Sequence, residues 1–354
     1  DTDRSLTAVH YGGGQVKQYL YHEAGLALPR QKNHLTGIVS ETGIRYASFS
    51  YDSKDRVLSS TVHGTPADTT TLNYDGPNHV TVTTAHEGTR EYTFQPGIYR
   101  RPLSTIDSAG NSRKSYDLQG RLETETDKRN HVTRYAYDAS GYVSAVTQAE
   151  DTPEQRRIEM DRAAATHLLT EHRIRDAAGV LKAKTAWTYN ARNQVASVTV
   201  TDPADNATRS IATTYCEAPD VSAANGACPI LGLVKTIDGP RPGTLDVTTY
   251  QYRPADEAGC AASPETCAYR KGDLWKVVNA SDHVTEILAY DGAGRLKSAK
   301  DVNGVITDFE YSPRGWLTAR KVRGTNDASE ADDRISRIEY LDHGLVHKII
   351  QPDG

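Results

Sequence analysis

Tyrosine recurs along this chain at a fixed distance from a residue that tolerates a left-handed backbone. Gly, Asn or Asp stands four positions after each of eight tyrosines: Tyr21/Gly25, Tyr51/Asp55, Tyr116/Gly120, Tyr137/Gly141, Tyr189/Asn193, Tyr290/Gly294, Tyr311/Gly315 and Tyr340/Gly344. These residue types adopt positive φ more readily than others. Six positions after each tyrosine stands an aliphatic residue: Ala27, Val57, Leu122, Val143, Val195, Leu296, Leu317 and Val346. The pattern predicts a strand that ends at the tyrosine, a tight turn and a returning strand.

A short polar residue follows the tyrosine in most of these units. The residues are Asp52, Asp117, Asp138, Asn190, Asp291 and Ser312. Such a side chain can accept a hydrogen bond from the backbone two residues later and so begin a turn. A second turn signal lies between units, at 107–110, 127–130 and 301–304.

Aromatic residues also occur in pairs separated by one residue. The pairs are Tyr19/Tyr21, Phe49/Tyr51, Tyr92/Phe94, Tyr135/Tyr137, Trp187/Tyr189, Tyr250/Tyr252 and Phe309/Tyr311. Residues i and i+2 share one face of a β-strand. The chain has 20 Tyr but only 3 Phe and 3 Trp, and Tyr suits a half-buried β surface because its ring is apolar and its tip is polar. Each pair therefore predicts a strand.

The spacing predicts a repeat architecture. Tyr116 and Tyr137 are 21 residues apart, as are Tyr290 and Tyr311. Two strands and two turns fit that length, so each unit is expected to form one hairpin-like rung. A rung cannot bury its aromatic face alone and must stack on its neighbours. We therefore expect an all-β fold with a single array over residues 1–354.

Two segments resemble a known repeat closely. Residues 116–122 (Tyr-Asp-Leu-Gln-Gly-Arg-Leu) and 290–296 (Tyr-Asp-Gly-Ala-Gly-Arg-Leu) resemble the YD, or RHS, repeat, whose core is Tyr-Asp-x-x-Gly-Arg-Leu. The residues that define the repeat here are Tyr51, Asp52, Tyr116, Asp117, Gly120, Arg121, Tyr137, Asp138, Gly141, Tyr189, Tyr290, Asp291, Gly294, Arg295, Tyr311 and Gly315. The resemblance extends from about Tyr19 to Val346.

The family comprises bacterial polymorphic toxins, C components of insecticidal toxin complexes, wall-associated proteins and teneurins. Membership implies a curved, spiralling β-sheet strip, part of a shell that in bacterial members encloses a toxic C-terminal domain. A self-cleavage segment and a toxin domain are not recognisable in this chain, so neither activity is carried over to it.

The period is interrupted at 152–178, where the Tyr-Asp motif is missing. The alternating polarity of residues 157–161 and the turn-like Ala177-Ala-Gly179 favour a pair of variant strands, with a helix as the alternative.

All four cysteines lie within 216–267, in two local pairs. Cys216 and Cys228 bracket one loop rich in small residues, and Cys260 and Cys267 bracket another. Two loop-closing disulfides, Cys216–Cys228 and Cys260–Cys267, are favoured, which implies an oxidising destination. The alternatives are pairing across the loops, free thiols, or a four-thiolate zinc site, although the spacing within each pair exceeds the usual Cys-x₂₋₄-Cys.

Charge and motif content argue against several functions. The chain carries 41 basic and 46 acidic residues, distributed along its length, rather than the basic stripe of a nucleic-acid-binding surface. Its apolar runs are all shorter than 18 residues, so we expect no membrane span. The sequence lacks Gly-x-Ser-x-Gly and His-Glu-x-x-His. We therefore expect no catalytic site, no cofactor and no metal.

Two functions remain. The first is a shell segment of a secreted bacterial toxin or effector, whose partner is the C-terminal toxin cargo of the parent chain. The alternative is a cell-surface module that binds a glycan or a partner protein through the rings of Trp187, Trp275 or Trp316. A component of a secretion apparatus is a further possible partner. Either function places the protein outside the bacterium or on its surface.

Overall fold

The computed structural model describes residues 5–11, 15–64, 67–223, 226–325, 327, 329–341 and 344–352. Within these residues the chain forms 27 β-strands and one short helix, α1 (Ala218–Ser222). The predicted all-β array of hairpins is therefore confirmed.

The chain divides into two compact units. Unit 1 comprises residues 1–134, 311–318 and 337–350, and unit 2 comprises residues 135–310, 319–336 and 351–354. A continuous array over 1–354 stays a prediction.

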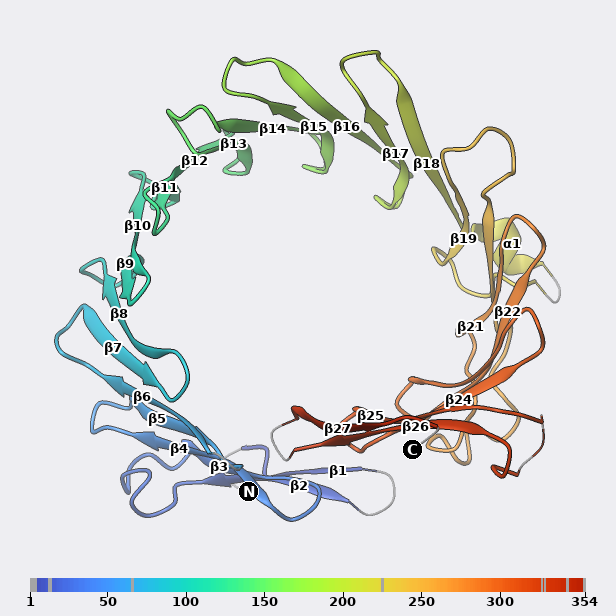
Figure 1. The fold of residues 1–354 in the computed structure, drawn as a ribbon, viewed down its shortest axis with the longest axis horizontal. Helices are drawn as coiled ribbons and strands as arrows, with labels where there is room; N and C mark the ends of the chain where they lie inside the picture. The colour runs from blue at the N-terminus through green and yellow to red at the C-terminus, as the bar shows by residue number, and fades with distance from the viewer. Residues whose placement is uncertain are drawn as a thin grey trace. The chain divides into compact units, whose positions relative to one another are not determined.

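Unit 1 holds the first eleven strands and the last two (Figure 1). They are β1 (Ala8–His10), β2 (Val16–Tyr21), β3 (Leu35–Val39), β4 (Arg45–Tyr51), β5 (Val57–Val62), β6 (Asp68–Asn73), β7 (His79–Thr84), β8 (Gly88–Phe94), β9 (Pro102–Asp107), β10 (Gly110–Tyr116), β11 (Leu122–Thr126), β26 (Arg334–Tyr340) and β27 (Val346–Ile350).

Unit 2 holds most of the remaining strands. They are β13 (Val143–Gln148), β14 (Arg156–Arg162), β15 (Leu169–Arg175), β16 (Leu181–Tyr189), β17 (Val195–Thr201), β18 (Thr208–Tyr215), β19 (Val234–Asp238), β20 (Thr248–Tyr252), β21 (Leu274–Val278), β22 (Val284–Tyr290) and β23 (Leu296–Lys300). The boundaries between the units fall within β12 (Val132–Tyr137), β24 (Ile306–Tyr311) and β25 (Leu317–Val322), and also within β26, of which residues 334–336 belong to unit 2.

Each β-ladder that the structure describes is antiparallel and joins strands that are consecutive in sequence. All seven aromatic pairs lie on strands, as predicted. The interrupted stretch 152–178 forms the strand pair β14 and β15 and not the alternative helix. Gly179 has a φ of 78° in the turn that follows.

The left-handed turn positions were predicted correctly. All eight residues that stand four positions after a repeat tyrosine have positive φ, from 62° at Asn193 to 92° at Gly344. The loop between Cys216 and Cys228 differs from the prediction because it contains α1. The Glu217 and Asp220 side chains cap its first turn reciprocally, and Pro219 lies at the start of the helix, where a missing N–H costs nothing.

Candidate functional site

Asp117 shows how the repeat turn is built. Its Oδ1 accepts hydrogen bonds from the backbone N–H groups of Gln119 (3.0 Å) and Arg121 (2.9 Å), and its Oδ2 accepts one from Arg121 Nε (2.7 Å). Asp52 and Asp291 make the same three bonds within their own turns. Hydrogen bonds to the charged form favour ionisation, and those at Asp52, led by the bond from the Arg56 backbone, lower its pKa to about 2.

A β-bulge stands next to several of the repeat turns. Ser115 pairs with Thr124, but Tyr116 pairs with Leu122, which leaves residue 123 unpaired. The same shift occurs immediately before Tyr51, Tyr189 and Tyr290. A bulge bends its strand and increases the local twist. Tyr51, Tyr116, Tyr189, Tyr290 and Tyr340 are thus each paired with the aliphatic residue six positions later. Tyr21 differs from the prediction, because it pairs with Leu35 and the returning strand does not begin at Ala27.

The tyrosine hydroxyls connect successive rungs. Among the contacts that the structure describes, nine hydroxyls donate to a backbone carbonyl oxygen earlier in the chain at 2.7–2.9 Å, eight of them to a residue of a strand: Tyr21 to Leu6, Tyr51 to Leu35, Tyr74 to Val57, Tyr116 to Pro102, Tyr189 to Leu169, Tyr215 to Val195, Tyr252 to Val234, Tyr290 to Leu274 and Tyr340 to Leu317. Val57, which accepts from Tyr74, pairs with Tyr51 of the preceding rung. Val195, which accepts from Tyr215, likewise pairs with Tyr189. The phenol of one rung therefore binds the turn-proximal residue of the rung before it.

Arginine of the turn reinforces one of these links. The Arg56 guanidinium lies 3.9 Å from the centre of the Tyr74 ring, within the range of a cation–π contact. The Tyr74 hydroxyl meanwhile binds Val57 O. Tyrosine, aspartate and arginine of the motif thus form one connected set of contacts across a rung boundary.

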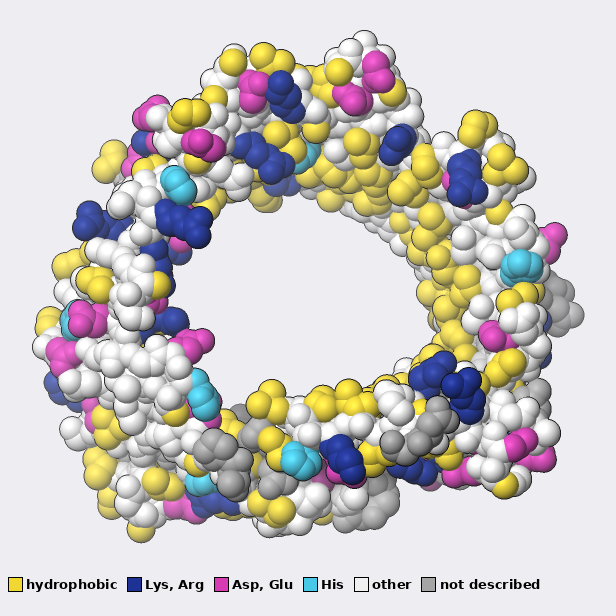
Figure 2. Space-filling model, in the orientation of Figure 1, with side chains coloured by type: hydrophobic (Ala, Val, Ile, Leu, Met, Phe, Trp, Pro, Cys, Tyr) yellow, Lys and Arg dark blue, Asp and Glu magenta, His cyan; other side chains and the backbone are white. Residues whose placement is uncertain are grey.

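The two faces of the unit 2 sheet differ in chemistry. The register from β13 to β24 places one predominantly apolar set of residues on the same face: Val146, Ile158, Ile174, Ala183, Trp187, Val198, Ile211, Ile237, Tyr250, Val277, Ile287, Ala299 and Phe309. We call this set the apolar face. It is not sealed, because Ile211 and the neighbouring Val200 on the same face are 44% and 47% exposed. Figure 2 shows hydrophobic side chains gathered along β16–β22.

The opposite face carries paired charges. Arg173 binds Asp161 (2.6 Å), Glu171 (2.5 Å) and Glu159 (3.3 Å), and Lys184 binds Glu171 (2.6 Å). The hydrogen bonds that the Arg173 guanidinium donates to these carboxylates, that to Asp161 first, raise the pKa of Arg173. The sheet is therefore amphipathic, with charge compensated on one side and apolar rings and methyl groups on the other.

Comparison with known proteins places these features in a family. The model of the RHS Repeat family matches residues 116–153 and 290–326, which include the two most regular turns. The chain contains RHS repeats. No curated protein sequence matches it.

Solved structures share the fold of this RHS-repeat chain. The crystal structure of TcdB2-TccC3 matches with a TM-score of 0.61 at 15% identity, over 96% of this chain and 18% of that chain. That of TcdB2-TccC3 without its hypervariable C-terminal region matches with a TM-score of 0.57 at 13% identity, over 95% and 18%. The TcdB2-TccC3-Cdc42 structure matches equally well, with a TM-score of 0.57 at 13% identity, over 96% and 18%. The chain thus spans less than a fifth of the length of each of these three chains.

Both favoured disulfides are present in the structure. Cys216 and Cys228, with Cα atoms 5.5 Å apart, form a buried cluster with Tyr252. Leu233, Tyr250 and Leu274 pack against this cluster. The first disulfide therefore attaches the 216–228 loop to the rung of β20 and β21.

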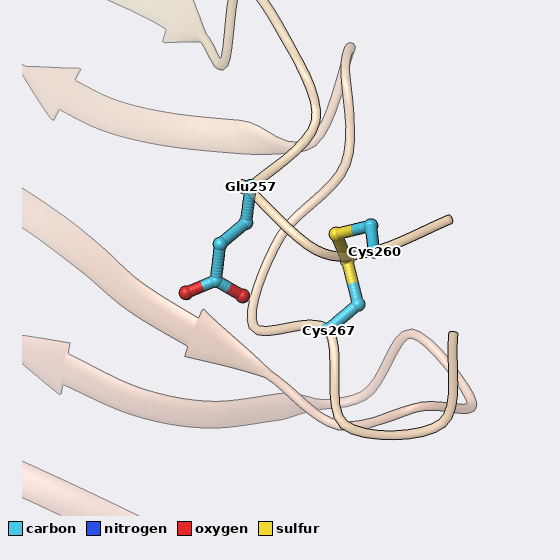
Figure 3. Close-up of side chains that lie close together, drawn as sticks. All are labelled: Glu257, Cys260 and Cys267. Atoms are coloured by element: carbon cyan, nitrogen blue, oxygen red, sulfur yellow. A yellow bond between two sulfur atoms is a disulfide. The ribbon is translucent and has the colours of Figure 1, made fainter. Parts of the chain in front are cut away.

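The second disulfide lies beside a carboxylate. Glu257 is close to Cys260 and Cys267 (Figure 3), in an arrangement of residue types that can ligate metals. The two sulfurs are bonded to each other, however, and only a thiolate is a metal ligand. Glu257 Oε2 instead accepts a hydrogen bond from the Ala268 N–H at 2.7 Å. Because all four cysteines are disulfide-bonded, they cannot form a four-thiolate zinc site. The hydrogen bond of Glu257 holds the second loop in place.

The two tryptophans of unit 2 lie on opposite faces of its sheet. Trp187 lies on the apolar face, opposite Val198. Trp275 is the unpaired residue of a bulge in β21, and its indole N–H donates to Glu286, which pairs with Lys276 on the charged face. Trp316 belongs to unit 1, where its ring packs at 5.1 Å from that of Tyr340. All three are half-buried.

Two cavities lie beside charged side chains that form ion pairs. One of about 640 Å³ in unit 2 is lined by residues from β22–β25 and the segment that follows. Its Lys321 binds Glu310 and Glu330, and its Arg323 binds Asp308 at 2.6 Å, so these charges are compensated within the protein. The other, of about 360 Å³, lies in unit 1 beside Glu41 and Arg314.

In the described part of the chain, no helix is long and apolar enough to cross a membrane.

Proposed function

We propose that this chain is a wall segment of the shell of a secreted bacterial RHS toxin, and that the apolar face of unit 2 holds a polypeptide cargo. The fold similarity to TcdB2-TccC3 over 96% of the chain supports a shell-like role in a toxin complex. The cargo is the C-terminal toxic domain of the parent protein. The role is structural and not catalytic.

The apolar face carries this proposal. Soluble monomers rarely leave large contiguous apolar patches open, and those that do use them to bind another molecule. Here the face runs through consecutive strands of a sheet, and Ile211 and Val200 on it remain nearly half exposed. Rings and aliphatic groups repeated at strand spacing offer many similar, weak contacts. Such a surface suits an unfolded chain better than a ligand of one defined shape.

The disulfides agree with secretion, because such bonds persist in oxidising compartments. The separation of Trp187 from Trp275, which face opposite sides of the sheet, disfavours a joint glycan-stacking patch. A glycan site on one tryptophan remains the alternative, and a contact with a secretion apparatus remains a prediction.

Adjacent residues on β17 provide a matched test. Val198 faces the apolar side, whereas Ser197 pairs with Ala212 on the other side. We expect Val198→Glu to weaken binding of a permanently unfolded probe, reduced and carboxymethylated α-lactalbumin, and Ser197→Glu to leave binding unchanged. Binding is measured by fluorescence anisotropy of the labelled probe. Equal effects of the two substitutions would contradict the proposal.

The parent protein provides the second test. Limited proteolysis with mass spectrometry should show a C-terminal region that resists protease until the array unfolds. Immediate digestion of that region beside an intact array would exclude encapsulation and favour the surface-binding alternative.

A further inference from the structure

We propose that Glu41 and Arg314 form a clasp that holds residues 311–318 and 337–350 against the N-terminal strands of unit 1, and that breaking this ion pair releases them. The clasp is a conformational device independent of the cargo.

The ion pair joins two turns that are far apart in sequence. Arg314 Nε donates to Glu41 Oε2 at 2.7 Å across 273 residues of chain. Glu41 lies in the turn between β3 and β4, where Ser40 N–H donates to Ile44 O. Arg314 lies in the turn between β24 and β25, where Gly315 N–H donates to Ser312 O.

Water has little access to the pair. The side chain of Glu41 is 3% exposed and that of Arg314 is 15% exposed. Burial acts to raise the pKa of Glu41, yet the hydrogen bond and charge of Arg314 hold it below its usual range. Both groups are therefore charged. Removal of Glu41 or Arg314 takes a charged hydrogen-bond partner away from a site with little water, which is destabilising.

Aromatic rings from both sides of the pair enclose the cation. The Arg314 guanidinium carbon lies 5.2 Å from the centre of the Tyr46 ring and 4.8 Å from that of Trp316. Tyr46 belongs to the N-terminal strands and Trp316 to the 311–318 segment. The guanidinium thus contributes cation–π contacts on both sides of the junction in addition to the ion pair.

The contacts continue from Trp316 into the last hairpin. The Trp316 ring packs against Tyr340, the last residue of β26. Gly344, with a φ of 92°, allows close approach, because a Cβ added there would lie 2.8 Å from Trp316 Cζ2. Displacement of Arg314 would therefore disturb the packing of β26 and β27, because the Trp316 ring contacts both the guanidinium and this hairpin.

Side chains and not strands make this junction. Among the described β-ladders, none joins β1–β11 to β26 or β27. The cavity of about 360 Å³ beside the pair is lined by Gln15 and Thr42 from one side and by Ile338 and Leu341 from the other. Water entering this cavity would solvate both charges once they separate.

The test follows Trp316 as the only tryptophan of the full chain, in a Trp187→Phe, Trp275→Phe background. We expect Glu41→Gln and Arg314→Met each to increase acrylamide quenching of Trp316 several-fold. Hydrogen exchange of peptides covering 311–318 and 337–350 should accelerate by roughly 100-fold. Arg314→Lys, which keeps the charge but loses the planar guanidinium, should give an intermediate result.

Glu339→Gln is the matched control, because Glu339 lines the same cavity outside the ion pair, and it should leave Trp316 quenching unchanged. The double variant Glu41→Gln, Arg314→Met should resemble either single variant, since both remove one interaction. Additive effects in the double variant, or unchanged quenching and exchange in folded single variants, would overturn the clasp. Arg314→Lys keeps the proposal testable if removing a charge prevents folding.

Discussion

The hydroxyl of Tyr252 donates a hydrogen bond to the carbonyl oxygen of Val234, 2.7 Å away. Val234 is the residue that pairs with Tyr215 of the preceding rung. One phenol thus connects two tyrosine positions that are 37 residues apart in the sequence. The repeat tyrosine therefore has two functions, because its ring covers the sheet while its hydroxyl binds the neighbouring rung.

Loss of that hydroxyl should destabilise the array measurably. We expect Tyr252→Phe to lower the free energy of unfolding by about 1 kcal/mol, with a further cost from the unpaired Val234 carbonyl. Tyr250→Phe on the same strand is the control, since its ring packs on the same cluster but the structure describes no hydrogen bond from its hydroxyl. Urea unfolding followed by circular dichroism provides the comparison. Equal losses in the two variants would argue against the hydroxyl link.

At the left-handed turn positions, the effect of a substitution on stability should depend on the backbone φ and not on steric clashes. Gly294 has a φ of 79° and no heavy atom within 4 Å of an added Cβ. Gly294→Ala should therefore cost about 1–2 kcal/mol from backbone strain without a clash. Asn193→Gly, at a φ of 62°, should change stability little, because glycine favours the same conformation. Thermal unfolding distinguishes these expectations.

Alkaline pH should loosen the rung that contains Tyr290. Burial raises the pKa of this phenol to about 12, from the usual 10.0. Its neutral form is thus favoured in the folded state. The resulting stabilisation is complete below pH 10 and is lost as the pH rises through about 12. The difference in 295 nm absorbance between the wild type and Tyr290→Phe would report this titration, and a midpoint near 10 would refute it.

Removal of the first disulfide should lower the free energy of unfolding more than removal of the second. Cys216–Cys228 closes 12 residues and forms part of a buried cluster, so we expect Cys216→Ala, Cys228→Ala to cost about 3 kcal/mol. Cys260→Ala, Cys267→Ala removes a shorter loop of 7 residues and should cost less. Both double variants are compared by chemical denaturation under oxidising conditions. A larger loss at the second loop would contradict this order.

The turns were the most predictable part of the structure from sequence, and the contacts between rungs were the least. Positive φ at Gly120 or Asn193 follows from local residue chemistry, as does the Asp117 turn. The disulfides were anticipated because each pair lies within one loop.

The bulge beside Tyr116 was not foreseen, because two-residue alternation does not reveal an extra residue in one strand. The hydroxyl bonds of Tyr74 and Tyr215 were also missed. Pro219 stands four positions after Tyr215, so that tyrosine lacks the Gly, Asn or Asp signal. Tyr74 has Asn78 at that position but is not among the eight units identified from the sequence. In both cases the hydrogen bond between rungs emerges only from the stacking of strands. The Glu41–Arg314 pair spans 273 residues, and nothing local in the sequence indicates such a partner.

That long separation affects how the protein can mature during its synthesis. Glu41 leaves the ribosome long before Arg314, by on the order of tens of seconds at about 5–20 residues per second. Residues 135–310 of unit 2, by contrast, are continuous in sequence, and their strands pair with strands made just before them. Until Arg314 has been made, the Glu41 carboxylate therefore lacks this partner and stays in contact with water. The rungs of residues 135–310 can already be complete by then. Residues 1–134 of unit 1 are therefore made before residues 135–310 of unit 2, whereas residues 311–318 and 337–350, which complete unit 1, are made after them.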